Sequence, residues 1–457
     1  MPRVFIKTYG CQMNERDSEQ VARQFQDRGY ELTDREEDAD VILLNTCSVR
    51  DQAETKAISN MGRLAALKRA RPDVVLGFMG CMVQSRGEEL LRKLPDVDLV
   101  VGTWRFHHVA SHVEDLLAAD GRRPRVADVI EEEGSERAIR DHVAGAPRAS
   151  AFVSVMQGCN MRCAFCIVPS VRGPERSRPI AEVVAEARAL AASGVREVVL
   201  LGQIVNAYGR REFPRERNRS PFVQLLEALE AVEDLRRIRF TAPHPTGFRD
   251  DLIGAFGRLP KLCEHVHLPA QSGSDRVLRT MKRSYTSDHY RRLVEKLRAR
   301  VPGLAISTDL IVGFPGETEE EFQQTVRFAR EMAFDQAFIF RFSPRKGTPA
   351  AGMPGQHSDE EKRRRNQELL AVVNDGMLRK LDAEIGRERE VLVEGTSAKN
   401  PARLTGRTRH NRIVVWPDDG AKPGDLRRMR IERRLGFSLL GAPGKDGGSP
   451  APAGDGV

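Results

Sequence analysis

The sequence predicts an α/β protein with three folded parts: an N-terminal doubly wound parallel sheet, a central partial or complete (β/α) TIM-like barrel, and a small C-terminal all-β domain. Strand-like runs alternate with helical patterns from residue 4 to about residue 380, which is typical of parallel sheets. Beyond that point short strands are separated by turns, which is typical of a small β module. We place the three domains at residues 1–118, 149–380 and 381–442, with a linker over 119–148 and a disordered tail over 443–457.

The N-terminal part shows four buried-strand patterns with helices between them. The expected strands cover residues 4–9, 41–44, 74–79 and 99–101. A helical pattern follows the first strand through residue 25, and another covers residues 52–69. This alternation favours a parallel sheet with helices on its faces.

The central part repeats the alternation on a longer scale. Its expected strands cover residues 152–155, 198–201, 238–241, 265–268, 305–312 and 337–342. Helices fall between them, among them 180–192 with Gly194 as its C-cap, and one that opens with a capping box of Thr318 and Glu321. Six such units suit a barrel, and barrels carry their chemistry on the loops after the strands.

The C-terminal part is expected to form strands over residues 390–394, 403–407, 413–416 and 430–433, after a long helix over 358–382. Its stretch 395–417 contains basic residues and no acidic residue. We expect it to hold an RNA backbone through Arg403, Arg407, Arg409 and Arg412. The alternative is a solvated β surface whose arginines pair with acids elsewhere in the fold.

Composition limits the class of protein. The 457 residues include 73 basic and 65 acidic side chains, so the net charge of +8 permits a polyanionic partner such as RNA. No apolar run approaches the roughly 20 residues of a membrane helix, and the N-terminus lacks the apolar core of a signal peptide. Seven cysteines are an odd number, which disfavours a disulfide framework. We therefore expect a cytoplasmic protein without a membrane partner, and a monomer.

Three cysteines lie close together in the loop after the first barrel strand. Cys159, Cys163 and Cys166 have Cys-x3-Cys-x2-Cys spacing, with Phe165 before the last of them. Thiolates are the usual protein ligands of iron–sulfur clusters, and three of them leave the fourth iron of a cubane open to a small molecule. The alternatives are packing cysteines or a zinc site, but zinc in a closed site takes four ligands and the nearby chain offers no fourth.

A second triplet is dispersed over the N-terminal part. Cys11, Cys47 and Cys81 each follow one of the first three expected strands. Because the carboxyl ends of neighbouring parallel strands meet at one edge of a sheet, we expect these thiols to converge and to hold a second cluster. Three unrelated buried cysteines are the alternative. Cys263 is left over, and we interpret it as a packing residue.

With both triplets identified, the chain resembles the methylthiotransferases, a group of the radical S-adenosylmethionine superfamily with an N-terminal cluster domain and a C-terminal TRAM domain. The resemblance covers about residues 3–440. It is carried by the following stretches: Thr8-Tyr9-Gly10-Cys11-Gln12-Met13-Asn14, Cys166-Ile167-Val168-Pro169, His267-Leu268-Pro269-Ala270-Gln271-Ser272-Gly273-Ser274 and Leu404-Thr405-Gly406-Arg407-Thr408.

The resemblance implies two 4Fe-4S clusters, a radical-generating one on Cys159, Cys163 and Cys166 and an auxiliary one on Cys11, Cys47 and Cys81. It also implies two S-adenosylmethionines per turnover, one as methyl donor and one as radical source, and a low-potential electron donor. We expect Phe165, Gly202 and Gln203 to contact the cofactor.

Within the group, Gln12-Met13-Asn14 favours the branch that adds a methylthio group to C2 of N6-isopentenyladenosine beside the anticodon of tRNA. The alternative branch acts on threonylcarbamoyladenosine. An alternative from another class is a non-catalytic iron–sulfur protein that binds RNA or senses redox state. Two positions depart from the family pattern: Ile204 stands where asparagine is common, and Ser170 stands where tyrosine is usual.

Overall fold

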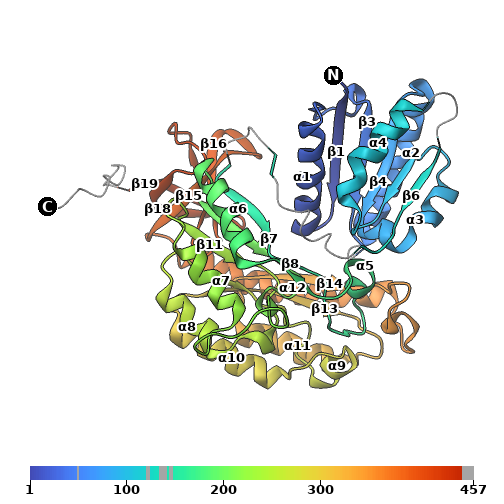
Figure 1. Cartoon of the computed structure of the whole chain (residues 1–457). Helices are drawn as coiled ribbons and strands as arrows, with labels where there is room; N and C mark the ends of the chain where they lie inside the picture. Colours follow the sequence, from blue (N-terminus) through green and yellow to red (C-terminus); the bar gives the residue numbers. More distant parts are fainter. Residues whose placement is uncertain (49–50, 120–123, 133–141, 144–147, 445–457) are drawn as a thin grey trace.

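The computed structural model describes residues 1–48, 51–119, 124–132, 142–143 and 148–444 of the chain, without the side chains of residues 51–53. Its elements form the three parts that the sequence predicts (Figure 1). The N-terminal sheet domain lies against the central barrel domain, and the C-terminal β-barrel docks on the barrel at a separate place. None of the helices in the described part of the chain is long and apolar enough to cross a membrane.

The N-terminal domain is a six-stranded, all-parallel sheet. The strands, in chain order, are β1 (Arg3–Tyr9), β2 (Glu31–Leu32), β3 (Val41–Thr46), β4 (Val75–Gly80), β5 (Leu99–Val101) and β6 (Val126–Asp128), and they lie in the order β2-β1-β3-β4-β5-β6. Helices α1 (Gln12–Asp27), α2 (Asp51–Ala70), α3 (Cys81–Lys93) and α4 (Val109–Ala118) connect them. Separate apolar clusters cover the two faces of the sheet, so it is doubly wound as predicted.

One strand of this sheet comes from the segment for which the sequence predicts a linker. Strand β6 pairs in parallel with β5, and Asp128 at its end is bound by Arg105 and His112. A strand of three residues is too short to show a two-residue period, so sequence pattern does not reveal it. The rest of the expected linker lies largely outside the described residues.

The central domain contains six parallel strands: β7 (Ser150–Ser154), β10 (Glu197–Leu201), β11 (Arg237–Phe240), β12 (His265–His267), β13 (Ala305–Val312) and β14 (Gln336–Arg341). They form two ladders, β7-β10-β11 and β12-β13-β14, and the described strands include none that pairs β7 with β14. The barrel is therefore partial. Every expected strand is present to within two residues of its predicted limits.

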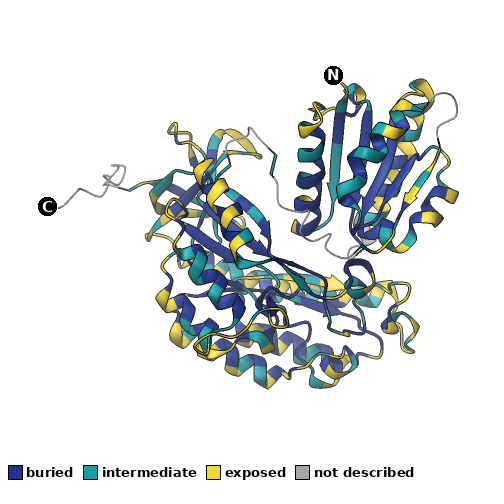
Figure 2. Ribbon diagram, viewed as in Figure 1, coloured by how far each residue is buried: buried dark blue, intermediate teal, exposed yellow. Residues whose placement is uncertain are grey.

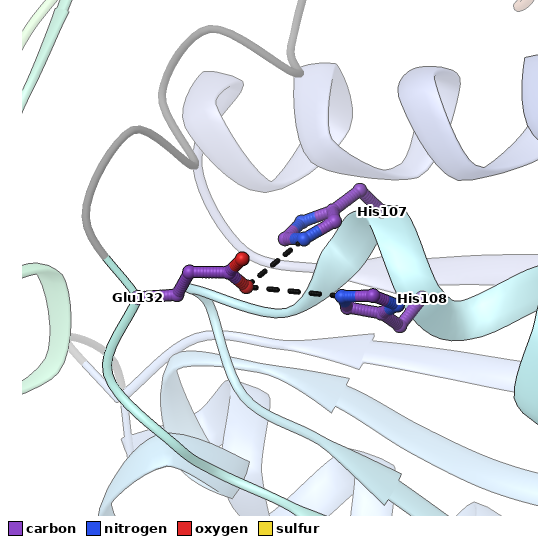
Figure 3. Close-up of side chains that lie close together, drawn as sticks. All are labelled: His107, His108 and Glu132. Atoms are coloured by element: carbon purple, nitrogen blue, oxygen red, sulfur yellow. Dashed lines mark ion pairs between the residues drawn. The ribbon is translucent and has the colours of Figure 1, made fainter.

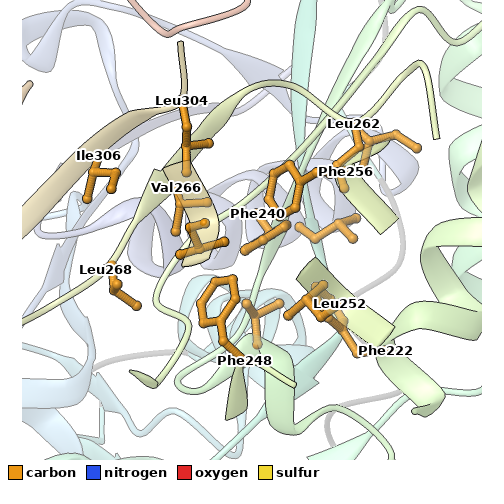
Figure 4. Close-up of a cluster of buried hydrophobic side chains, with 14 of the residues drawn as sticks. Phe222, Phe240, Phe248, Leu252, Phe256, Leu262, Val266, Leu268, Leu304 and Ile306 are labelled. Carbon is orange, nitrogen blue, oxygen red and sulfur yellow. The ribbon is translucent and has the colours of Figure 1, made fainter. Parts of the chain in front are cut away.

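Helices cover the outer face of these strands: α6 (Ile180–Ala192), α7 (Pro221–Glu230), α8 (Asp250–Arg258), α10 (Ser287–Arg300), α11 (Glu319–Met332) and α12 (Asp359–Asp382). Figure 4 shows part of the core, where Phe222, Phe240 and Phe256 pack with aliphatic side chains. The capping box of Thr318 and Glu321 is present at the start of α11. Buried residues concentrate on the central strands of both α/β domains (Figure 2).

The C-terminal domain is a closed five-stranded barrel. Its strands are β15 (Glu388–Ser397), β16 (Asn400–Thr408), β17 (Ile413–Pro417), β18 (Leu426–Leu435) and β19 (Ser438–Pro443), in the order β15-β16-β17-β19-β18. The sequence predicts only four of them. Strand β19 pairs with both β17 and β18 and closes the barrel. The expected disordered tail lies, except for its first two residues, outside the described residues.

Candidate active site

The three-cysteine loop follows two short strand segments at the carboxyl end of the partial barrel. Strand β7 runs into β8 (Met156–Gln157), the loop holds Cys159, Cys163 and Cys166, and α5 (Val168–Arg172) follows. Gly158 has φ +81, and a Cβ there would lie 1.8 Å from the carbonyl oxygen of Pro174. Only glycine fits this turn, which brings the chain into the loop.

The backbone of the loop is held from several sides. The amide of Cys159 donates to the carbonyl of Gly173 at 3.0 Å, and the amide of Ala164 donates to the carbonyl of Met281 at 3.0 Å. Cys159 and Cys163 are buried, and all three thiols are free of disulfides. The loop is thus a fixed support for three sulfur atoms.

The electrostatics of this triplet disfavour free thiolates. Burial raises the pKa of Cys159 to about 11 and that of Cys166 to about 12. Among the described residues, Arg283 compensates part of this charge, because its Nη1 lies 3.2 Å from Sγ of Cys163. Three ionised sulfurs in this place need more positive charge than one guanidinium supplies, and a bound iron–sulfur cluster would supply it.

The other expected cofactor contacts lie on two sides of the loop. Phe165 packs against Ile311 and Phe314 in the cluster at the end of β13. Gly202 lies at the end of β10, where a Cβ would be 2.6 Å from Cγ of Met156, so glycine permits the strand end to approach the loop.

Two amides beside the loop have unused hydrogen-bonding atoms. In the described part of the chain, Oε1 of Gln203 and Nε2 of Gln157 are buried without a hydrogen-bond partner. Buried polar atoms of this kind are rarely left unpaired in a folded protein. Together with the three thiols, they fit a polar cofactor bound at this loop.

The second triplet converges as the strand order predicts. Cys11 is the N-cap of α1, Cys47 follows β3 directly, and Cys81 is the first residue of α3 after β4. Strands β1, β3 and β4 are neighbours in the sheet, so their carboxyl ends bring the three cysteines to one edge. A hydrogen bond between the side chains of Cys11 and Cys47 lowers the pKa of Cys11 to about 6, although burial opposes this.

A buried arginine connects the two triplets. Arg172 is the last residue of α5, the helix that begins two residues after Cys166. Its guanidinium binds the buried carboxylate of Asp17 at 2.5 and 3.3 Å and makes a side-chain hydrogen bond to Cys81. Ile167 and Val171 also pack on Cys81. Helix α5 therefore links the cysteine loop to Cys81, and it lies where the N-terminal domain meets the central domain (Figure 1).

Sequence reasoning did not find Arg172 or Arg283. Arginine is common on protein surfaces, and nothing in the local pattern separates a buried arginine from a solvated one. The single available signal is that Arg172 belongs to the short segment directly after the cysteine loop.

The two departures from the family pattern have different surroundings. Ile204 is buried against Cys159 and Ala207, so it contributes an apolar contact to the cysteine loop. Ser170 is exposed on α5. Cys263 is buried, and burial raises the pKa of its thiol, in keeping with a packing role.

Three of the four candidate arginines of the C-terminal domain form ion pairs with acids, as the alternative interpretation expects. Arg407 binds Glu394 at 2.8 Å, Arg409 binds both carboxylate oxygens of Glu264, and Arg412 binds Asp335 and Glu384. Glu394 directly precedes the stretch 395–417 and Glu384 lies shortly before it, whereas Glu264 and Asp335 belong to the barrel domain, where local sequence does not show them. Arg403 alone of the four has no ion-pair or hydrogen-bond partner among the residues that the structure describes.

The end of β16 and the turn between β16 and β17 pack on the amino-terminal ends of the barrel strands. Arg239 of β11 donates to the carbonyls of Thr408 and Arg409, and Arg237 donates to the carbonyl of Arg407. Arg409 donates in return to the carbonyls of Pro260 and Leu262. This part of the β-barrel is therefore an interdomain contact.

A separate group of possible metal ligands lies on the N-terminal domain. Nε2 of His107 is 3.0 Å and Nε2 of His108 is 3.8 Å from the same carboxylate oxygen of Glu132 (Figure 3). Arg105 forms an ion pair with the same oxygen. Because this guanidinium already satisfies the carboxylate, the group is fully explained as an ion-pair network.

The fold and the cysteine loop define a member of the radical S-adenosylmethionine proteins. The profile of the Radical SAM superfamily matches residues 153–329, that of an uncharacterised family, UPF0004, matches residues 3–102, and that of the TRAM domain matches residues 382–443. The solved radical S-adenosylmethionine methyltransferase TsrM of Kitasatospora setae has a similar fold, with a TM-score of 0.53 at 14% identity over 77% of each chain.

Sequence relatives define the family more narrowly. The tRNA-2-methylthio-N(6)-dimethylallyladenosine synthase of Akkermansia muciniphila is 53% identical over 97% of this chain and 99% of its own length. The proteins of the same name from Methylacidiphilum infernorum and Opitutus terrae are 51% and 50% identical over 97% and 96% of this chain, and 95% and 97% of their own lengths. The chain belongs to this family of tRNA-modifying radical S-adenosylmethionine enzymes.

Proposed function

We propose that this enzyme adds a methylthio group to C2 of N6-isopentenyladenosine beside the anticodon of tRNA. Family membership supports the reaction, and one structural observation supports the two-cluster form of it. Helix α5 begins two residues after Cys166 of one triplet, and its residues Val171 and Arg172 contact Cys81 of the other triplet. A methylthio transfer needs a sulfur source and a radical source close together, and this arrangement provides both places.

In this proposal Cys159, Cys163 and Cys166 hold a radical-generating 4Fe-4S cluster and Cys11, Cys47 and Cys81 hold an auxiliary one. When bound, the first cluster and S-adenosylmethionine would supply a carbon radical, and a second S-adenosylmethionine would supply the methyl group. The protein fixes the thiolates, compensates part of their charge with Arg172 and Arg283, and buries both sites away from bulk water. A low-potential donor supplies the electron, and the enzyme acts as a monomer.

The substrate is a tRNA that already carries the isopentenyl group. This group is apolar, and each methylene that it buries contributes about 0.8 kcal/mol that unmodified adenosine lacks. Turnover is compared on tRNA with isopentenyladenosine, with threonylcarbamoyladenosine and with unmodified adenosine. Preference for the threonylcarbamoyl form would assign the chain to the neighbouring branch.

A single measurement separates the enzyme from a non-catalytic iron–sulfur sensor. The reconstituted, reduced protein is incubated with S-adenosylmethionine, and 5′-deoxyadenosine is quantified. Release of this product is expected, and mass spectrometry of tRNA nucleosides then identifies the methylthio product. A protein that binds both iron–sulfur clusters and tRNA but releases no 5′-deoxyadenosine would be a sensor.

A further inference from the structure

Two phenylalanines on the edge strand of the partial barrel are exposed to solvent. Phe338 and Phe340 of β14 are 42% and 37% exposed. The other exposed large apolar side chains among the described residues do not share a strand with one another: Met1, Leu32, Ile130, Leu370, Ile385 and Phe437. Paired exposed aromatics on one face of one strand need an explanation, because water contact with such side chains is unfavourable.

The alternation of β14 directs both rings to the inner face of the barrel. Ala337 and Ile339 pack on the apolar core, and Asn366 of α12 donates to the carbonyl of Ile339 at 2.9 Å, so this face is the outer one. Successive side chains of a strand point to opposite faces. Phe338 and Phe340 therefore point inward, opposite Asp309 and Ile311 of β13 in the parallel register.

The neighbours of the two rings connect them to the cysteine loop. Ile311, the register partner of Phe340, packs in one cluster with Ala164 and Phe165 of that loop. Phe338 lies farther from the loop, with its ring centroid 6.0 Å from that of His267. His267 is in turn held by Ser307 at 3.0 Å and by Asp309 at 3.3 Å. Phe338 and Phe340 thus form an apolar strip that extends inward from the radical site, and His267 and Asp309 form its polar border.

Other parts of the chain contact the strands β7, β10 and β11. Met13 and Cys11 of the N-terminal domain pack on Phe152, Val199 and Leu201 of β7 and β10. At the amino-terminal end of the strands, the turn between β16 and β17 binds Arg237 and Arg239. In contrast, the rings of Phe338 and Phe340 on β14 remain exposed.

We propose that Phe338 and Phe340 form the platform that receives the target adenine and its N6-isopentenyl group. This inference rests on the proposed function and adds to it the residues that select the substrate. Aromatic faces stack on bases of any kind, and they also accept an apolar prenyl chain. The carboxylate of Asp309, 27% exposed beside Phe338, would repel the carboxylate of a threonylcarbamoyl group. The strip therefore favours the isopentenyl form for two independent reasons.

The test compares Phe338→Ala and Phe340→Ala with the control Leu370→Ala, which removes an exposed apolar side chain from the outer helix α12. Loss of a stacked ring is expected to raise the KM for isopentenylated tRNA roughly 5- to 100-fold. Phe338→Tyr, which keeps an aromatic face, should restore most of the lost affinity. The control should leave the KM for tRNA within about twofold of the wild-type value. Iron content and circular dichroism of each variant establish that it is folded.

Other outcomes separate this inference from the proposed function. Wild-type protein that makes no methylthio product would overturn the proposed function itself. An active wild type with unchanged KM for tRNA in both alanine variants would overturn the platform alone. If the KM for S-adenosylmethionine rises as much as that for tRNA, the rings serve the cofactor, and the inference is wrong. Asp309→Asn should also narrow the preference for isopentenyl over threonylcarbamoyl tRNA, and an unchanged preference would contradict the repulsion argument.

Discussion

The two cysteine triplets form comparable sites by different routes. Cys159, Cys163 and Cys166 lie within eight consecutive residues of one loop, so they are close in space because they are close in the chain. Cys11, Cys47 and Cys81 are brought together only by the order of β1, β3 and β4 in a parallel sheet. Folding of a single loop is enough to bring the first three cysteines together. The second three come together only when the whole N-terminal domain has folded. Their surroundings differ as well: burial raises the pKa of Cys159 and Cys166, while a hydrogen bond with Cys47 lowers that of Cys11.

The largest effect is expected from the local triplet. Replacing Cys159, Cys163 and Cys166 with alanine should abolish 5′-deoxyadenosine formation, because no thiolate remains to hold the radical cluster. Bound iron should fall from about eight to about four atoms per chain, as expected for the loss of one of two cubanes. Iron analysis and chromatography of the nucleoside measure both quantities. Retention of eight iron atoms would show that these thiols are not the ligands.

The dispersed triplet should give the complementary result. Alanine at Cys11, Cys47 and Cys81 should also leave about four iron atoms, but cleavage of S-adenosylmethionine should persist while methylthiolation disappears. Persistence follows because the barrel carries its own cysteine loop. Mass spectrometry of tRNA nucleosides measures the product. Methylthio product from this variant would contradict the assignment of two clusters to two triplets.

Sequence pattern predicted the features that local rules decide. The strands of both α/β domains, the spacing of the three-cysteine loop and the capping box of α11 follow from period, residue type and short motifs. The convergence of Cys11, Cys47 and Cys81 required one further rule, that strand ends in a parallel sheet meet at one edge. These are the parts of the molecule where the prediction and the structure agree.

What the pattern missed depends on contacts between distant segments. Strand β6 has three residues and gains its stability from pairing with β5. The partners of Arg172 and Arg409 are Asp17 and Glu264, each more than one hundred positions away in the chain. Such pairs are set by tertiary packing, which a single sequence does not display. The inward direction of Phe338 and Phe340 likewise appears only once the outer face of β14 is known.

Substitutions of Arg172 and Arg283 distinguish the two triplets further, and we expect their effects to be smaller than those of the cysteine substitutions. Arg172→Gln leaves the buried carboxylate of Asp17 without its partner, which should cost about 3–5 kcal/mol in the free energy of unfolding. Iron loss should be confined to the auxiliary site, because Arg172 contacts Cys81. The matched variant Arg283→Gln should affect the radical site, since Arg283 contacts Cys163. Chemical denaturation and iron analysis test both variants. Loss of the same cluster in both variants would contradict the assignment of Arg172 to the auxiliary site and of Arg283 to the radical site.

The smallest effect concerns the arginines whose long-range partners the sequence does not show. Arg412 is 14% exposed and binds Asp335 and Glu384, so Arg412→Ala should lower the free energy of unfolding by about 1–3 kcal/mol, while Arg403→Ala should change it by less than about 0.5 kcal/mol. Burial alone would raise the pKa of Glu384, but Arg389 and Arg412 outweigh it and lower that pKa to about 2.

The sign of the pH dependence follows from that lowered pKa. A carboxylate whose folded-state pKa lies below its ordinary value of 4.5 stabilises the protein above pH 4.5, and the stabilisation is lost as the pH falls towards 2. The difference between wild type and Arg412→Ala should therefore shrink over this range, measured by denaturation of the metal-free proteins. The binding of tRNA should rank the two variants in the opposite order. Arg403→Ala should reduce the salt dependence of tRNA binding by nearly one unit of log–log slope, as expected for the loss of one phosphate contact, and Arg412→Ala should reduce it less. A stability loss in Arg403→Ala that equals the loss in Arg412→Ala would contradict the structural role assigned to Arg412, because of these two arginines only Arg412 forms an ion pair with the barrel domain.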